Sequence, residues 1–356
     1  MSARDLSWRD EAMQVLAGLE LVADAPLSKR TTFGIGGPAD LLALARNDDD
    51  VAAVLGFADD RGLGLFVLGG GSNLLVRDGG VRGIVLSLVG DLASLVISEG
   101  GKRIDVGAGC TYPRLTRTAL ELGWPSAVGW MGTPGQVGGA LLMNAGSRWG
   151  EIKDVVVEVT TASAGRIAVV PAAACGFGYR TSAFQQPQRQ IGGSAIGAQA
   201  GGCSLGAEGG SASANGRSFD ASLTSADPKM KRVVLTRAIL RCDNSQIEKA
   251  DELNARAKEL LVRRHQTQPK LRSAGSLFKN PPGDFAGRLI EASGLKGFAV
   301  GRAQVSTVHA NFVVNLGGAT AHDVVALADH VIATVRAQQG VTLEWEVRRV
   351  GEDASR

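Results

Sequence analysis

Short runs of apolar residues, separated by turn residues, fill the first ninety positions of the chain. The runs Asp40–Ala45, Leu63–Leu68 and Gly83–Leu88 have the length of strands, and the pattern from Asp48 to Asp60 predicts a helix between the first two. We therefore expect a small unit of strands and one helix over residues 26–90. An N-terminal extension, residues 1–25, precedes it and has no assigned role.

A second block of alternating elements covers residues 91–245. Its periodicity predicts four strands and one helix, and the apolar residues of this helix share one face. The helix is Tyr112–Leu122, and the strands are Ile104–Val106, Val155–Thr160, Ile167–Val170 and Val233–Leu240. Residues 187–228 interrupt the pattern, because 24 of these 42 residues are Gly, Ala or Ser. So little apolar surface cannot offset the entropy cost of ordering, and we expect a flexible insertion there.

The last block, residues 246–356, combines amphipathic helices with strands, which is an α+β pattern. A helix that begins at Gln246 and ends near Pro269 places Leu253, Ala257 and Leu260 on one stripe. The other elements predicted in this block are the helices Phe285–Ser293 and Ala321–Gln338 and the strands Ala310–Val314 and Thr342–Val350.

Charge and cysteine content narrow the class of protein. Lys+Arg 38 and Asp+Glu 35 give a net charge of +3 over 356 residues, which is too weak a positive field to indicate nucleic-acid binding. The four Cys residues form no C-x-x-C pair and no zinc-ligand spacing, so neither disulfides nor a metal site is indicated. The charged N-terminus lacks a signal-peptide pattern, and no apolar run is long enough to span a membrane. We expect a cytoplasmic monomer that binds no metal, nucleic acid or membrane.

Glycine is the main departure from average composition, with 48 residues in 356. The segment Gly34–Ala39 matches the G-x-G-x-x-A pattern of dinucleotide-binding folds, but it follows polar residues instead of a buried strand and contains Pro38. The chain has no P-loop pattern either. Both common nucleotide-binding signatures are thus disfavoured.

Two glycine clusters remain as candidate ligand sites. In the first, an apolar run leads into Gly69-Gly70-Gly71-Ser72-Asn73, whose backbone N–H groups would suit a phosphate. The alternative is a tight turn between strands. The second cluster, Gly129–Gly146, holds six glycines among apolar residues such as Trp130 and Leu141. So much glycine in an apolar segment favours contact with a ligand over a purely structural role.

Five motifs together resemble one family. Gly69–Asn73 and the segment 132–139, Gly-Thr-Pro-Gly-Gln-Val-Gly-Gly, look like the two flavin-binding segments of the vanillyl-alcohol-oxidase type of FAD domain. Within that group the chain, from about Pro26 to Gly351, is similar to the UDP-N-acetylenolpyruvoylglucosamine reductase family, in its shorter subtype without the extra substrate-closing loop. The resemblance implies an α+β flavoprotein of three domains. Residues 26–90 and 91–245 would form the FAD-binding unit, and residues 246–356 would bind the substrate.

The other three motifs carry the residues to which the resemblance assigns catalysis, namely Arg180 in Gly176–Phe184, Ser276 in Ser273–Pro281 and Glu346 in Leu343–Arg348. The implied reaction uses NADPH and non-covalent FAD to reduce the enolpyruvyl group of UDP-N-acetylglucosamine enolpyruvate, which gives UDP-N-acetylmuramate for peptidoglycan. Arg180 would stabilise the negative charge that develops on the substrate carboxylate. Ser276 would donate a proton to carbon, and Glu346, if protonated, would assist.

The resemblance also implies a set of ligand-binding residues. Those expected near FAD are Gly69, Gly70, Gly71, Ser72, Asn73, Gly132, Thr133, Pro134, Gly135, Gly138, Gly139, Asn144, Gly146, Arg264 and Arg348, and those expected near the substrate are Tyr179, Lys279, Asn280 and His309. Whether Arg263 or Arg264 faces the flavin stays open. Two alternative functions also remain: an FAD-dependent oxidase of the same fold that acts on a sugar or alcohol, and a non-catalytic flavin-binding protein. The joint presence of Arg180, Ser276 and Glu346 argues against the second.

Overall fold

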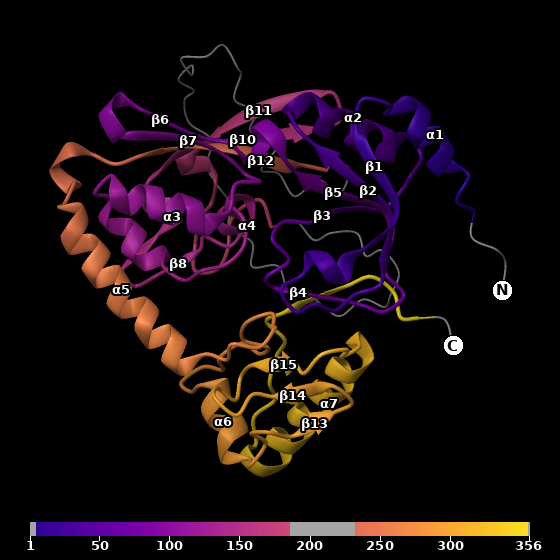
Figure 1. Cartoon of the computed structure of the whole chain (residues 1–356), viewed down its shortest axis with the longest axis vertical. Helices are drawn as coiled ribbons and strands as arrows, with labels where there is room; N and C mark the ends of the chain where they lie inside the picture. The colour runs from indigo at the N-terminus through magenta and orange to yellow at the C-terminus, as the bar shows by residue number, and fades with distance from the viewer. Residues whose placement is uncertain (1–4, 186–231, 355–356) are drawn as a thin grey trace.

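Three parts of the chain lie around a common centre in the computed structural model, which describes residues 5–185 and 232–354 (Figure 1). The predicted insertion at residues 187–228 lies outside the described residues. Within the described ranges, no helix is both long enough and apolar enough to cross a lipid bilayer.

The first part is a four-stranded sheet with the strand order β1-β2-β5-β3. Its strands are β1 (Glu20–Pro26), β2 (Pro38–Ala45), β3 (Leu65–Val67) and β5 (Val81–Leu88). β1 pairs antiparallel with β2, whereas β5 runs parallel to both β2 and β3. Helix α2 (Asp48–Asp60) begins after Asn47, whose side chain accepts a hydrogen bond from the N–H of Asp50, as N-cap residues commonly do.

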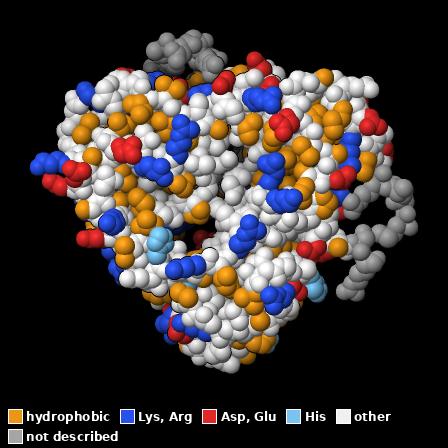
Figure 2. All heavy atoms as spheres, viewed as in Figure 1, with side chains coloured by type: hydrophobic (Ala, Val, Ile, Leu, Met, Phe, Trp, Pro, Cys, Tyr) orange, Lys and Arg blue, Asp and Glu red, His pale blue; other side chains and the backbone are white. Residues whose placement is uncertain are grey.

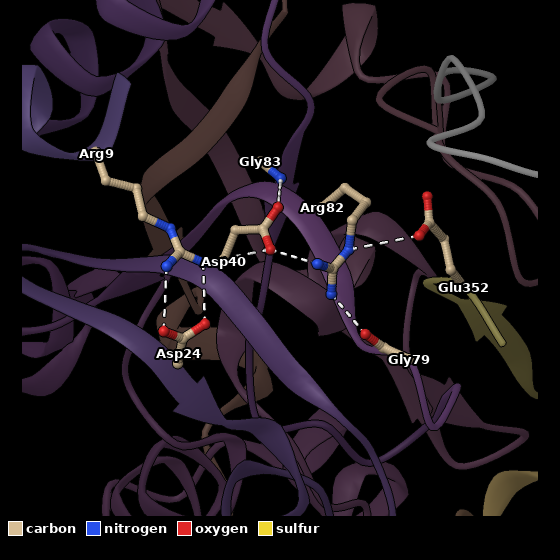
Figure 3. A network of polar contacts seen from close by, with 7 residues as sticks. All are labelled: Arg9, Asp24, Asp40, Gly79, Arg82, Gly83 and Glu352. Carbon is tan, nitrogen blue, oxygen red and sulfur yellow. Dashed lines mark hydrogen bonds and ion pairs between the residues drawn. The ribbon is translucent and has the colours of Figure 1, made fainter. Parts of the chain in front are cut away.

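The N-terminal residues belong to this first sheet. Helix α1 (Trp8–Val15) precedes β1, and Ala12 and Leu16 lie in the main hydrophobic core. Figure 3 shows the polar contacts that fix α1: Arg9 pairs with Asp24 and Asp40, and Asp40 also accepts from Arg82 and from the N–H of Gly83. The segment expected to be an extension therefore contributes a helix, a strand and a buried ion-pair network.

The second part is a five-stranded antiparallel sheet with the order β11-β10-β12-β7-β6. Its strands are β6 (Leu95–Ser98), β7 (Arg103–Gly107), β10 (Val156–Ser163), β11 (Arg166–Pro171) and β12 (Val234–Arg241). Helices α3 (Tyr112–Glu121) and α4 (Val137–Leu142) and the short hairpin of β8 (Gly146–Ser147) and β9 (Gly150–Glu151) complete this part. One core, which includes Tyr112, Trp124 and Trp130, joins this sheet to α2 of the first part.

The third part is built around a second hydrophobic core, to which Phe33, Ile35 and Leu75 of the first part also contribute. It contains helices α6 (Ala286–Ala292) and α7 (Ala321–Gln339) and a small antiparallel sheet of β13 (Ala299–Val300), β14 (Ala303–Val305) and β15 (Val313–Asn315). Helix α5 (Ala250–Thr267) is the long diagonal helix in Figure 1 that connects the second part to the third. Strand β16 (Arg348–Val350) returns to the first part, where it pairs in parallel with β4 (Leu74–Val76).

Most predicted helices and strands are present within one to four residues of their expected ends, and α2 has the predicted bounds. β15, Val313–Asn315, begins three residues later and ends one residue later than the predicted strand Ala310–Val314. One predicted strand is wrong in extent: Thr342–Val350 is a strand only over Arg348–Val350. Before β16, Trp345 forms a single bridge to Phe278 and not a continuous ladder.

Candidate active site

The two glycine clusters meet backbone to backbone. A Cβ atom on Gly70 would lie 2.7 Å from Cα of Gly135, and a Cβ on Gly135 would lie 2.9 Å from Oγ of Ser72. Since real Cβ atoms are not found so close to other heavy atoms, only glycine permits this contact. Gly71 and Gly135 also have positive φ angles, +58° and +104°, which glycine adopts without steric cost. The predicted ligand segments thus form one continuous glycine surface.

The backbone of the first cluster is open to a ligand. Among the described residues, the N–H groups of Gly69 to Asn73 donate no hydrogen bond to another protein atom, although Gly71 accepts one from Thr32. A run of backbone N–H groups without protein acceptors is a typical anion-binding arrangement. In the second cluster, a Cβ on Gly139 would meet no atom within 4 Å, so this glycine faces open space.

Other glycines of the second cluster are required by the protein itself. Gly138 packs on Ala108 and donates its N–H to the Ala108 carbonyl. A Cβ on Gly146 would lie 2.3 Å from the carbonyl oxygen of Gly150, across the β8–β9 hairpin. Thr133 donates its N–H to Trp130, and Pro134 is exposed beside it. The glycine requirement at Gly138 and Gly146 is therefore explained without a ligand.

Arg264 is the arginine of α5 that faces the glycine surface. Its side chain lies on Gly132, where a Cβ would be 2.9 Å from Cδ of Arg264, whereas Arg263 is exposed. Burial lowers the pKa of Arg264, and the nearby charge of Arg180 lowers it further. Burial likewise lowers the pKa of Arg348, whose N–H donates to the carbonyl of Asn73 in the first cluster. The side chain of Arg264 thus lies on the second cluster, and the backbone of Arg348 is hydrogen-bonded to the first.

Arg180 lies at the apex of a tight turn. The N–H of Gly178 donates to the carbonyl of Thr181 at 3.0 Å, and the N–H of Thr181 donates back to Gly178 at 3.3 Å. Arg180 has a φ of +55°, a conformation that few residues other than glycine adopt and that is found preferentially at functional sites. Tyr179 beside it is 86% exposed. Both predicted site residues are therefore exposed and not buried in the fold.

Ser276 and Glu346 lie on adjacent extended segments of the third part. The N–H of Glu346 donates to the carbonyl of Leu277 at 2.9 Å, and Ser276 forms a bridge with Phe312 on its other side. The side chain of Asn73 donates to the carbonyl of Glu346 at 3.4 Å. The first glycine cluster, the Ser276 segment and the Glu346 segment therefore meet at one point, although more than 200 positions separate Asn73 from Ser276.

The charge of Arg180 acts on Glu346. Burial raises the pKa of Glu346, while the charges of Arg180 and Lys279 act in the opposite direction. The Arg180 turn of the second part therefore lies within electrostatic range of the Glu346 segment of the third part. Figure 2 shows a hollow between these parts, with Lys and Arg side chains around it.

The predicted substrate-binding residues near Glu346 already have protein partners. Lys279 forms an exposed ion pair with Glu344 at 3.3 Å, and the side chain of Asn280 accepts from the N–H of Ala286 at the start of α6. Nδ1 of His309 accepts from the N–H of Asn311, and burial lowers the pKa of this histidine. A ligand would have to share or replace these contacts.

Sequence reasoning missed Asn311, which is nearly fully buried. Its side chain accepts from the N–H of Phe278 and donates to the carbonyl of the same residue, so it holds the segment that carries Ser276. A polar residue within an otherwise apolar run, Ala310 to Val314, was the available signal.

The arrangement fits FAD. The open N–H groups of residues 69–73 and the cations Arg264 and Arg348 suit a pyrophosphate, and the side-chain-free surface at Gly139 suits a flat group. Among the described residues, no group of three His, Cys, Asp or Glu side chains could hold a metal ion.

Comparison with known proteins gives two family matches. Residues 39–167 match the family "FAD binding domain", and residues 267–350 match "UDP-N-acetylenolpyruvoylglucosamine reductase, C-terminal domain".

Curated relatives and a solved structure resemble nearly the whole chain. A UDP-N-acetylenolpyruvoylglucosamine reductase of Anaeromyxobacter dehalogenans (strain 2CP-C) is 40% identical over 348 residues, which cover 98% of this chain and 90% of the relative. One of Symbiobacterium thermophilum is 39% identical over 330 residues, which cover 92% and 91%. The crystal structure of the reductase from Thermus caldophilus matches with a TM-score of 0.68 and 33% identity, covering 94% of this chain and 99% of that one.

Proposed function

Since the chain belongs to the UDP-N-acetylenolpyruvoylglucosamine reductase family and is an FAD-dependent oxidoreductase, we propose that it reduces the enolpyruvyl group of UDP-N-acetylglucosamine enolpyruvate to the lactyl ether of UDP-N-acetylmuramate, with NADPH as reductant. The observation that carries this proposal is the position of Glu346 among three motifs. Its backbone is hydrogen-bonded to Asn73 of the first glycine cluster and to Leu277 of the Ser276 segment, and the charge of Arg180 acts on its carboxyl group.

FAD, when bound, supplies the hydride that reduces the substrate and takes its electrons from NADPH. We assign its binding to the glycine surface of residues 69–73 and 132–139 and to the cations Arg264 and Arg348. No His lies next to either glycine cluster, so the chain offers no imidazole there to attach the flavin covalently. This supports non-covalent binding.

Arg180 would bind the carboxylate of the enolpyruvyl group. Hydride addition to the methylene carbon places negative charge on the neighbouring carbon and on this carboxylate, so a cation is needed where the charge develops. A guanidinium group holds a carboxylate through two parallel hydrogen bonds and stays charged at any working pH. The exposed position of Arg180 at the apex of its turn supports this role.

Ser276 and Glu346 would complete the reduction by delivering a proton to carbon. A hydroxyl held in place can protonate one face of the intermediate, whereas bulk water would not select a face. Burial favours the protonated form of Glu346, and a neutral carboxyl group can donate a hydrogen bond to the charged intermediate. Tyr179, Lys279, Asn280 and His309 would bind the anionic nucleotide-sugar around this centre.

Anaerobic spectroscopy of the purified protein tests the proposal. The protein should be yellow, NADPH should bleach it, and UDP-N-acetylglucosamine enolpyruvate should restore the colour. A colourless protein that binds no added FAD would contradict the flavin assignment. If the reduced protein regains its colour only with oxygen, the oxidase alternative replaces the reductase.

A further inference from the structure

Asn144 lies two residues before the end of the second glycine cluster and is 1% exposed. Its Nδ2 donates to the carbonyl oxygen of Gly178 at 2.9 Å and to Oε2 of Glu151 at 3.0 Å, and its Oδ1 accepts from the N–H of Lys153 at 3.2 Å. A side-chain amide has two N–H donors and one oxygen, so every polar group of this side chain has a protein partner. Both N–H donors and the oxygen of the side chain are thus hydrogen-bonded within the protein.

The Gly178 carbonyl belongs to the turn that carries Arg180. Two further side chains attach this turn to the end of α4: Ser182 donates to the carbonyl of Leu142 at 2.9 Å, and Gln185 donates to Leu142 at 3.0 Å and to the carbonyl of Arg180 at 2.9 Å. Asn144 is the least exposed of the three attachments, and it holds the base of the turn, where Gly178 also pairs with Thr181.

We propose that Asn144 is a positioning residue for Arg180, which it fixes against the flavin-binding segment through Gly178, and that its side chain is not a flavin ligand. The part of this inference that concerns catalysis rests on the proposed function. The residue type agrees with it: Asn144 has a φ of +44°, a conformation that Asn and Asp tolerate better than most residues. An asparagine can therefore occupy this backbone position and still bond to two segments, residues 151–153 and the turn at Gly178.

Two substitutions separate this role from cofactor binding. Asn144→Asp keeps the size and suits the positive φ, but it replaces both donors with an oxygen that faces the Gly178 carbonyl and the Glu151 carboxylate. Asn144→Gly also suits the backbone and removes the contacts without adding charge. The matched control is Asn244→Asp, the same change at an exposed position of the second part.

Hydrogen exchange and stopped-flow kinetics are the measurements. In both Asn144 variants, the amides of residues 176–185 should exchange about tenfold faster, because the turn opens more often once a hydrogen bond is lost. Reduction of bound FAD by NADPH should stay within about twofold of wild type, while reoxidation by the enolpyruvyl substrate should slow at least about tenfold, as for Arg180→Ala. Asn244→Asp should match wild type in all three.

Loss of FAD, a shifted flavin absorption band, or equal slowing of both half-reactions would overturn the proposal, because each would mean that Asn144 contacts the cofactor. Unchanged exchange over residues 176–185 would overturn it as well. If wild type itself fails to be reoxidised by the substrate while exchange rises in the variants, the proposed function is contradicted and the anchoring of the turn by Asn144 is supported.

Discussion

Burial and charge act in opposite directions on the carboxyl group of Glu346, and the effect of burial is the larger one. The folded protein therefore holds this proton more tightly than the unfolded chain does. Below the ordinary pKa of 4.5 both states are protonated, and as pH rises above it the folded state loses stability relative to the unfolded one.

Glu346→Gln should consequently stabilise the protein at neutral pH while it impairs turnover. The difference in the free energy of unfolding, variant minus wild type, should be near zero at pH 4 and should increase in favour of the variant up to pH 8. Urea denaturation at a series of pH values measures this difference. A difference that is constant with pH would contradict the burial of the charge.

Ser276→Ala should separate the two half-reactions. Loss of the hydroxyl should leave flavin reduction by NADPH near normal and slow reoxidation by the substrate at least about 100-fold, because a positioned proton donor contributes about this much to a rate. Stopped-flow absorbance of the flavin measures both steps. Equal loss in the two half-reactions would exclude Ser276 as the proton donor.

At the residue scale, sequence motifs predicted the catalytic residues Arg180, Ser276 and Glu346 through a family resemblance, and their roles stay predictions. They did not predict how these residues are held. Asn144, Asn311 and Gln185 act through hydrogen bonds to backbone groups of distant segments, and no spacing in the sequence encodes such a contact. The sequence marks Asn144 only as part of a glycine cluster, where a ligand role was the natural interpretation.

At the scale of elements, strands and helices with a strong apolar period were predicted well, and α2 and α7 are examples. The extended segment before β16 was predicted as a strand because Leu343, Trp345 and Val347 alternate with polar residues. Alternation reports which side chains are buried but not whether a partner strand is continuous, so it cannot distinguish one bridge from a ladder.

Helix α7 begins with its own capping box of Thr320 and Asp323, and another part of the molecule adds to this cap. The carboxylate of Asp78, in the turn between β4 and β5, accepts from the N–H groups of Ala321 and His322 at 2.8 and 3.0 Å. Asp78→Ala should lower the free energy of unfolding by about 1 kcal/mol, the usual effect of losing a cap. Asp78→Asn, which retains one acceptor oxygen, should lose less. Urea denaturation would contradict this contact if Asp78→Ala matched wild type.

At the scale of the whole molecule, the sequence could not reveal that the N-terminal segment belongs to the first sheet, because β1 is largely exposed and its apolar pattern is weak. The β1–β2 ladder, the burial of Ala12 and Leu16, and long-range ion pairs fix it. The meeting of residues 69–73 with residues 132–139 is equally non-local, and only the family resemblance predicted that both segments serve one cofactor. The domain boundaries expected from the sequence stay predictions.

The network in Figure 3 should be a major contributor to stability. Asp40 is nearly buried between Arg9 and Arg82, so Asp40→Ala removes one carboxylate partner from each of two largely buried cations. We expect the free energy of unfolding to fall by about 3 kcal/mol. Glu252→Ala, which removes an exposed ion pair with Lys249, should change it by less than about 0.5 kcal/mol. Equal effects of the two substitutions in urea denaturation would contradict this view of the network.

The central claim is that three motifs, brought together at Glu346, reduce an enolpyruvyl ether. Mass spectrometry of a single anaerobic turnover tests it most directly, with the flavin reduced by one equivalent of NADPH before UDP-N-acetylglucosamine enolpyruvate is added. We predict one UDP-N-acetylmuramate, two hydrogens heavier than the substrate, for each flavin reoxidised, and almost none over the same time with Ser276→Ala. A reduced flavin that persists beside unchanged substrate in the wild-type protein would contradict the account.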